Sequence, residues 1–347
     1  MTLSPTARHI PPRVLARLQP ASARRPRVRA QEPRTCGEEL TCPQLASVDE
    51  LLEWTPAKAK QDPAPGLNAS GAPRCAGGDN GRPRVVHLHD MMGGYNMAAD
   101  HYYRLGYGGW GIVDSFVYFA HSTVSVPPLS WIRDCHEHGV PILGTVLVET
   151  QGDEVSLEQN WPAVARNLVA IAQHYRFEGY LINVERSNMG APAVLNNVLD
   201  ALRRGNLTAV YYDSLDAAGQ SGYQNELNLE NKAYFDHASS ILTNYWLESD
   251  LSLDKSLEVA GGARAADVTI GVDVFGRGTN YSAGQGITAI LELVAARRNL
   301  SVGLFAPGWT YENFRQPTAD NASWAAFERR FWEETVSRFT TRPVCSE

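Results

Sequence analysis

The chain has 347 residues, of which 44% are hydrophobic and 20% are charged, a composition typical of a soluble globular protein. Its formal net charge of −7 argues against a general nucleic-acid binder, so no nucleic-acid partner is expected. No apolar run reaches the about 18 residues that a transmembrane helix needs, so no membrane partner is expected either.

The first part of the chain, residues 1–46, is rich in arginine and proline and is predicted to be a disordered basic tail. Its first 31 residues contain no Asp or Glu, which is typical of an organellar transit peptide and equally of an unstructured tail. Residues 47–83 are predicted to form a short helix and a linker. Ser47 is a suitable N-cap for this helix, and Pro56 stops it.

From residue 84 to residue 340, short β-branched or apolar runs alternate with helical stretches. This alternation predicts an α/β fold with a parallel sheet, and eight units in roughly 250 residues fit a (β/α)8 TIM barrel. A doubly wound open sheet is the main alternative, but its Gly-rich phosphate turn does not match HDMMGGYN after the first strand. The predicted strands are 84–88, 111–119, 140–148, 179–184, 207–212, 239–246, 267–275 and 301–306, and the clearest helices are 157–175, 191–205 and 287–298.

Polar and aromatic residues gather at the predicted C-terminal ends of these strands, where barrel enzymes place their sites. Aromatic faces pack on the C–H faces of sugars, and carboxylates and amides bond sugar hydroxyls, so this mixture favours a carbohydrate ligand. Taken singly, each aromatic residue could equally serve only to close the barrel. The predicted substrate-binding residues are His89, Asp90, Phe119, Glu149, Tyr223, Asn244, Tyr245, Trp246, Asp273, Trp309 and Tyr311.

The strongest chemical signal is GYLINVE, residues 179–185. Because side chains alternate along a strand, Asn183 and Glu185 share one face. A lone Glu in a partly apolar barrel mouth has a raised pKa and stays protonated, as a general acid must. Ordinary glycosidases use a second carboxylate, and here that position holds an amide. An amide can hold a 2-acetamido group that supplies its own nucleophile, so the pair indicates substrate-assisted cleavage of an N-acetylhexosamine.

His87-x-His89 raises a rival hypothesis, because metal-dependent amidohydrolases begin with such a pair after the first barrel strand. Those enzymes place further His ligands at the ends of strands five and six. The corresponding ends here, YYDS and TNYW, contain no His. No metal site is therefore predicted; His87 is expected to be packed, and His89 to bond substrate or Asp90.

Seven segments then carry a resemblance to a known family: HDMMGGY (89–95), FVYFAHSTVSVPP (116–128), HGVPILGT (138–145), GYLINVE (179–185), YYDS (211–214), GVDVFGRG (271–278) and FAPGWTYE (305–312). In this order they resemble the endo-β-N-acetylglucosaminidases of glycoside hydrolase family 85, and the cytosolic plant and animal enzymes most of all. The resemblance runs from about Ser47 to Phe339.

The resemblance implies a (β/α)8 barrel that hydrolyses the β-1,4 bond between the two GlcNAc residues of the N-glycan core. One GlcNAc stays on the protein or peptide and configuration is retained; family members often transglycosylate as well. The implied catalytic residues are Glu185 as general acid/base, Asn183 as the group that orients the acetamide of an oxazolinium intermediate, and Tyr212 beside them. No cofactor is implied, and the implied partners are N-glycans, glycopeptides or free oligosaccharides.

The implied location is the cytoplasm, with an organelle as the alternative suggested by the Arg-rich start. Relatives often have Trp where this chain has Tyr223, so the balance of hydrolysis and transfer is expected to differ. Many family members continue into β-sandwich domains, none of which is evident here, and residues 341–347 are predicted to be a short C-terminal tail. A glycan-binding, lectin-like barrel is the alternative function, and the joint presence of the three catalytic residues argues against it.

Overall fold

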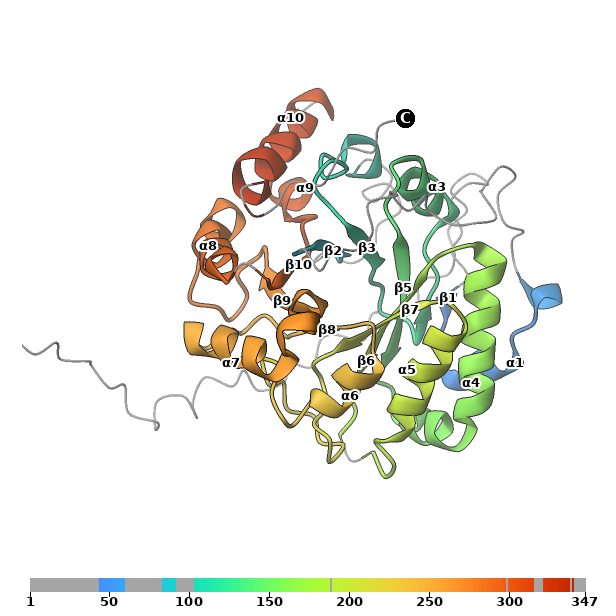
Figure 1. The fold of residues 1–347 in the computed structure, drawn as a ribbon. Coiled ribbons are helices and arrows are strands. Elements are labelled where there is room, and N and C mark those ends of the chain that lie inside the picture. The colour runs from blue at the N-terminus through green and yellow to red at the C-terminus, as the bar shows by residue number, and fades with distance from the viewer. Residues whose placement is uncertain are drawn as a thin grey trace, which may run out of the picture. The chain divides into compact units, whose positions relative to one another are not determined.

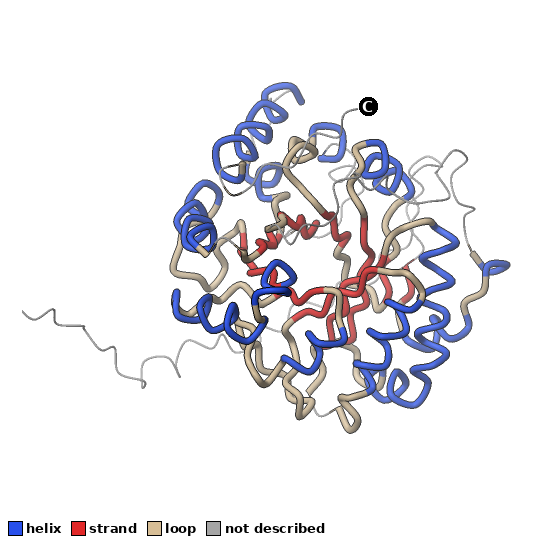
Figure 2. Tube along the Cα trace, viewed as in Figure 1, coloured by secondary structure: helices blue, strands red, loops and turns tan. Residues whose placement is uncertain are grey.

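Among the described residues, eight parallel β-strands close into a ring in the computed structural model, with helices around them (Figures 1 and 2). The ring closes because the last strand pairs in parallel with the first, Val302 opposite Val85. The eight predicted strands and the (β/α)8 fold are therefore confirmed. The barrel strands are β2 (Val85–His89), β3 (Ser115–Tyr118), β5 (Ile142–Val148), β6 (Gly179–Val184), β7 (Thr208–Tyr212), β8 (Ser240–Leu242), β9 (Val268–Asp273) and β10 (Ser301–Phe305).

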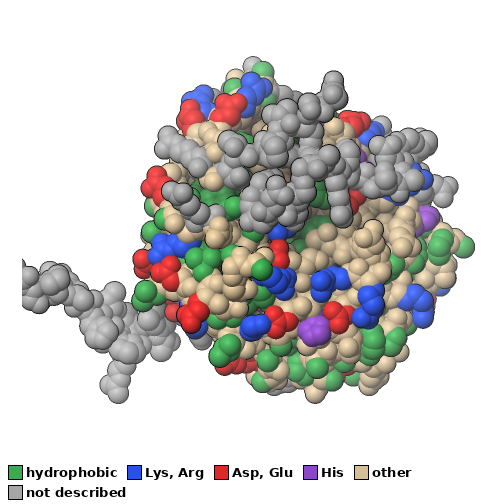
Figure 3. All heavy atoms as spheres, viewed as in Figure 1, with side chains coloured by type: hydrophobic (Ala, Val, Ile, Leu, Met, Phe, Trp, Pro, Cys, Tyr) green, Lys and Arg blue, Asp and Glu red, His purple; other side chains and the backbone are tan. Residues whose placement is uncertain are grey.

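The structure describes residues 44–59, 83–91, 103–187, 189–297, 299–314, 321–337 and 339. The chain divides into two units, residues 1–36 and 37–347, and every described residue belongs to the second unit. Residues 1–43 of the predicted N-terminal tail, most of the predicted linker and the predicted C-terminal tail lie outside the described residues. The prediction that the disordered tail extends to residue 46 is wrong, because Gln44–Leu45 forms a strand that pairs with Val124–Ser125. Within the described part, no helix has both the length and the apolar character needed to cross a bilayer. On the face seen in Figure 3, acidic and basic side chains are interspersed.

Helices lie on the outside of the barrel between successive strands (Figure 2). Helix α5 shows why: Leu195, Val198, Leu199 and Leu202 repeat at helical spacing, and all four are buried against the barrel. The helices that follow the first barrel strand include α3 (Leu129–Glu137), α4 (Asp153–Tyr175), α5 (Val194–Arg204), α6 (Lys232–His237), α7 (Asp250–Ala260), α8 (Thr288–Ala296), α9 (Trp309–Asn313) and α10 (Asn321–Phe331). There are also 3-10 turns at Pro56–Lys58, Gly262–Asp267 and Gly284–Ile287 and a π-helical turn at Trp332–Val336.

Two apolar clusters separate the inside of the barrel from its outer layer. Along β6, Tyr180 and Ile182 belong to the outer cluster between strands and helices, whereas Leu181 belongs to the inner cluster. Strand register aligns the inner residues, because Phe305 lies opposite Leu88 and Leu88 lies opposite Val117. The inner cluster consists of Leu88, Val117, Leu143, Leu181, Val210, Tyr212, Leu242 and Phe305. The barrel is therefore filled, and a ligand can bind only beyond this plug, at a strand end.

The predicted short N-terminal helix is present as α1 (Val48–Glu53), and the Ser47 hydroxyl accepts the Glu50 N–H at 3.1 Å as expected for an N-cap. This helix packs on α4. Before it, β1 (Gln44–Leu45) pairs antiparallel with β4 (Val124–Ser125), which pairs with β5. Asp153, in the first turn of α4, accepts the Val48 N–H at 3.1 Å. The segment before the linker is thus part of the folded unit.

Leu51 of α1 is 1% exposed, so Leu51→Ala should leave a cavity against α4 and cost about 2–5 kcal/mol of unfolding free energy. Urea unfolding monitored by tryptophan fluorescence measures this loss. Leu229→Ala is the matched control, because Leu229 is 77% exposed and its truncation should change stability by less than about 0.5 kcal/mol. Equal stability of the two variants would mean that α1 is not held on the barrel in solution.

Candidate active site

Asn183 and Glu185 point into the barrel from the end of β6, as strand alternation predicts, because the intervening Val184 belongs to the outer cluster. The Asn183 Nδ2 donates to Glu185 Oε1 at 3.1 Å. The backbone here is held from both sides. The Val184 N–H donates to the Ser214 hydroxyl at 3.3 Å, and the Glu185 N–H donates to the Val148 carbonyl at 2.9 Å. The two side chains therefore form one preorganised acid–amide pair.

The side-chain carbonyl oxygen of Asn183, Oδ1, is an unused hydrogen-bond acceptor. The residue is 1% exposed, and its Oδ1 has no hydrogen-bond partner among the described residues. A buried polar atom without a partner is costly and is generally satisfied by water or a ligand. With its NH2 turned to Glu185, Asn183 presents this oxygen to an N–H or O–H donor in the barrel mouth.

Burial raises the pKa of Glu185, and the hydrogen bond from Asn183 opposes the rise. The negative charge of Glu149, exposed at the end of β5, raises the pKa further, whereas His121 and the Tyr223 hydroxyl lower it. The protonated carboxyl therefore persists to higher pH than in an ordinary glutamic acid. Such a group can donate a proton to a leaving oxygen and take one back afterwards.

Tyrosine hydroxyls line the site next to this pair. Tyr212 is 5% exposed in the inner cluster, and its hydroxyl donates to Asn244 Oδ1 at 2.8 Å. The Tyr223 ring lies 6.2 Å from the Tyr212 ring and 5.7 Å from the Trp246 ring, centroid to centroid. Burial raises the pKa of Tyr212 and of Tyr223, so both remain protonated donors at neutral pH. The rings and hydroxyls together suit a sugar ring with its substituents.

A second polar group lies at the ends of β2 and β9. Asp273 is fully buried, and its two oxygens accept hydrogen bonds from the Arg277 guanidinium at 2.8 and 2.9 Å. The Asp273 carboxylate is therefore paired with Arg277 and does not face the open barrel mouth. The Arg277 guanidinium lies 5.9 Å from the centre of the Tyr245 ring. Asp90 Oδ1 is buried without a hydrogen-bond partner among the described residues, with His121 Nε2 at 3.9 Å. Asp90 can therefore accept hydrogen bonds from a ligand.

Three predicted site residues lie elsewhere. The prediction that His89 bonds substrate or Asp90 is wrong, because His89 is 0% exposed and stacks in the outer layer on Tyr103, with ring centroids 5.3 Å apart. Alternation along β2 puts the neighbouring Asp90 on the opposite, inner face. The Trp309 and Tyr311 rings also pack outward, where they contact aromatic side chains of α10.

Phe119 contacts the inner cluster, and its ring meets His121 edge-on at 5.5 Å. His121 was missed by the sequence reasoning, although it follows β3, the second barrel strand, in the same FVYFAHST segment as Phe119. His87, the other member of the His-x-His pair, is buried in the outer layer with its ring 4.4 Å from that of Phe116. Both histidines of the pair therefore face away from the mouth, and no group of three or more metal-ligating residues occurs in the described part of the chain.

A closed (β/α)8 barrel with an acid–amide pair at the end of its fourth strand is the arrangement expected of a barrel glycoside hydrolase. Residues 89–346 match the model of Glycosyl hydrolase family 85. The chain belongs to that family. The predicted resemblance is therefore confirmed.

Curated relatives agree with this assignment. The protein named cytosolic endo-beta-N-acetylglucosaminidase in Gallus gallus is 34% identical over 87% of this chain and 43% of its own length. The Homo sapiens protein of the same name is 36% identical over 87% of this chain and 42% of its own length. The Arabidopsis thaliana protein named cytosolic endo-beta-N-acetylglucosaminidase 2 is 37% identical over 72% of this chain and 38% of its own length. The chain thus spans less than half the length of these relatives.

Among solved structures, the glycoside hydrolase domain of Endo-D from Streptococcus pneumoniae R6 superposes with a TM-score of 0.62 at 17% identity. The match covers 84% of this chain and 50% of that one. At this identity it supports the barrel fold only.

The charges and hydrogen bonds around Glu185 predict two opposite shifts of its pKa. Glu149→Gln removes a negative charge and should lower the pKa, whereas Tyr223→Phe removes a hydrogen bond to the ionised form and should raise it. The measurement is an infrared pH titration of the protonated carboxyl band, taken as the difference from Glu185→Gln. Glu230→Gln, in an exposed loop position, should leave the pKa unchanged. Shifts of the same sign in the two test variants would refute this description of the site.

Proposed function

We propose that this chain is an endo-β-N-acetylglucosaminidase that hydrolyses the β-1,4 bond between the two GlcNAc residues of the N-glycan chitobiose core. The product is a protein or peptide that keeps one GlcNAc. The observation that carries the proposal is the buried Asn183 oxygen beside the high-pKa carboxyl of Glu185. Family membership supports it, as do the printed names of the curated relatives.

The proposed reaction needs one carboxyl group from the protein. Glu185 gives its proton to the glycosidic oxygen as the bond to the anomeric carbon breaks. The acetamide oxygen of the substrate bonds to that carbon and forms an oxazolinium ion, while Asn183 Oδ1 accepts the acetamide N–H and stabilises the positive charge. Ionised Glu185 then takes a proton from water, which opens the ring with overall retention. A sugar hydroxyl in place of water gives transglycosylation.

Two fully buried acids of the barrel mouth, Asp273 and Asp213, are engaged by other groups, so neither is placed to act as a protein nucleophile. Asp273 is bound by Arg277, and Asp213 faces away and accepts four N–H donors. The Tyr212 and Tyr223 hydroxyls lie next to Glu185 and, as neutral groups, can bond the acetamide or the reacting oxygen without competing as nucleophiles.

The proposed substrates are N-glycans, glycopeptides or free oligosaccharides with a chitobiose end. We propose that Asp90, Phe119, Asn244, Tyr245 and Trp246 contact the sugars on the donor side, since each lies on or beside the inner cluster or the polar network of the mouth. A cytoplasmic site of action agrees with the relatives' names, and the Arg-rich start keeps an organelle as the alternative.

Removing the acid gives the first test of this function. Wild-type protein should convert a high-mannose glycopeptide into peptide carrying one GlcNAc, as mass spectrometry would show. Glu185→Gln should lower the rate by at least about 100-fold, because the general acid is lost, while glycopeptide binding persists. Glu230→Gln should keep the wild-type rate. Binding without turnover in the wild type would favour the lectin-like alternative, and full activity of Glu185→Gln would exclude the proposed acid.

The role of Asn183 predicts a different pattern. Asn183→Ala should slow glycopeptide hydrolysis by about 100–1000-fold, as for loss of a donor or acceptor that acts on transition-state charge. Asn183→Gln, which keeps an amide oxygen, should retain some transfer from a preformed sugar oxazoline. Matched hexosaminides without the 2-acetamido group should react far more slowly with the wild type. Equal rates with and without that group would rule out the substrate-assisted route.

A further inference from the structure

The segment between β7 and α6, residues 213–231, is a long loop at the active-site end of the barrel. The structure describes all of it, and it contains no helix or strand beyond an isolated bridge between Leu215 and Ser221. It carries Tyr223. Loops of this length in compact domains are uncommon and usually functional, and they need specific contacts to hold one conformation.

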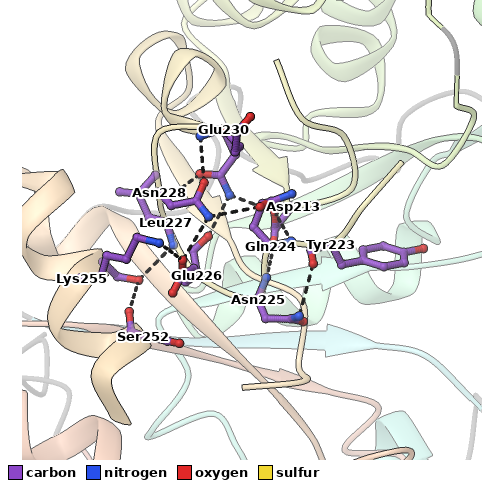
Figure 4. A network of polar contacts seen from close by, with 12 residues as sticks. Asp213, Tyr223, Gln224, Asn225, Glu226, Leu227, Asn228, Glu230, Ser252 and Lys255 are labelled. Carbon is purple, nitrogen blue, oxygen red and sulfur yellow. Dashed lines mark hydrogen bonds and ion pairs between the residues drawn. The ribbon is translucent and has the colours of Figure 1, made fainter. Parts of the chain in front are cut away.

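Asp213, the first residue of this loop, is 0% exposed, and among the described residues it forms no ion pair with a Lys, Arg or His side chain. Its Oδ1 accepts the Gln224 N–H at 3.2 Å and Asn231 Nδ2 at 2.9 Å. Its Oδ2 accepts the Asn225 N–H at 2.7 Å and the Asn244 N–H at 3.5 Å. Figure 4 shows Gln224 and Asn225 next to Asp213, with the Tyr223 ring pointing away from the carboxylate. One carboxylate thus connects the start, middle and end of the loop with Asn244, the second residue after β8.

The same contacts reach the reacting groups. The Asn244 side chain donates to Asn225 Oδ1 at 2.7 Å and accepts from the Tyr212 hydroxyl at 2.8 Å. Asn225 has a left-handed backbone, with φ of 58°, which a non-glycine residue adopts only where its surroundings hold it. Since Tyr223 lies two residues before Asn225, release of that conformation would move the hydroxyl that meets Glu185.

We propose that Asp213 is a positioning residue for the acid–amide pair, acting on Glu185 through Tyr223 and through the Asn244–Tyr212 contact. The inference rests on the proposed function. All four groups that face the carboxylate are N–H donors, so only an ionised acid can satisfy them together. Burial raises the pKa of Asp213 to about 7 although the four hydrogen bonds oppose the rise, so keeping the charge is costly. Neutral hydrogen-bonding groups could hold this loop in one conformation at a lower desolvation cost than a buried carboxylate.

Asp213→Asn tests the proposal with almost no change in size. The amide offers one acceptor oxygen and turns an NH2 group toward N–H donors, which should displace the loop. We expect kcat on glycopeptide to fall about 100-fold with KM little changed, as for a small misplacement of catalytic groups. Asp216→Asn is the matched control. Asp216 lies in the same loop and accepts the N–H groups of Ala218 and Gln220, away from Tyr223, so this variant should stay within about twofold of the wild type.

A double-mutant cycle separates positioning from general destabilisation. Tyr223→Phe alone should lower kcat on glycopeptide about 10-fold. If Asp213 acts through Tyr223, Asp213→Asn combined with Tyr223→Phe should be no slower than Asp213→Asn alone, within about twofold. Multiplied losses, with rates corrected for the folded fraction from thermal unfolding, would overturn the proposal. So would an unchanged kcat in Asp213→Asn.

If Asp213→Asn does not fold, Asn231→Ala replaces it, because this variant removes only one of the four donors. The same cycle with Tyr223→Phe should again show less than multiplicative losses, and multiplied losses would again overturn the proposal. Failure of the Asp213 proposal can be told apart from failure of the proposed hydrolase function. Wild-type turnover that is lost in Glu185→Gln supports the hydrolase assignment whatever the Asp213 variants show.

Discussion

The chemistry of this barrel depends on the burial of one carboxyl next to one amide. Partial burial of Glu185 favours its neutral form, and the Asn183 NH2 group partly offsets that preference. The balance matters for both halves of the proposed cycle. A carboxyl with too high a pKa could not give up its proton, and one with an ordinary pKa would already have lost it at neutral pH. Alternation along β6 is what brings both groups to the same side.

This pair can be precise because the barrel below it is filled. The inner cluster plugs the interior, and in-register partners from Phe305 through Leu88 to Val117 leave the strand ends little freedom to shift. The polar groups above the plug are held by one another, as when Arg277 takes both oxygens of Asp273. Rigid strands therefore carry the acid and the amide, while a loop carries Tyr223.

Much of the fold could be predicted from the sequence because β-branched runs and helical spacing are local signals. Helix α5 was visible for that reason, whereas α6, with six residues, is too short to show a period. Strand alternation also predicted that Asn183 and Glu185 share one face, which their hydrogen bond confirms. The same rule, had it been applied to β2, would have separated His89 from Asp90. The Asp213 network joins residues up to 31 positions apart through hydrogen bonds, and spacing alone does not reveal such contacts.

The docking of α1 on α4 bears on where the domain can be cut. The family pattern begins at residue 89, the last residue of β2, whereas the described fold already starts at Gln44. A gene trimmed to the family pattern would encode a barrel lacking its first strand and an α4 stripped of the apolar cover that Val48 and Leu51 provide. Such a fragment would expose an apolar surface on α4 and an unpaired edge of the sheet, and both features promote aggregation. The folding unit of this domain is therefore larger than its sequence signature.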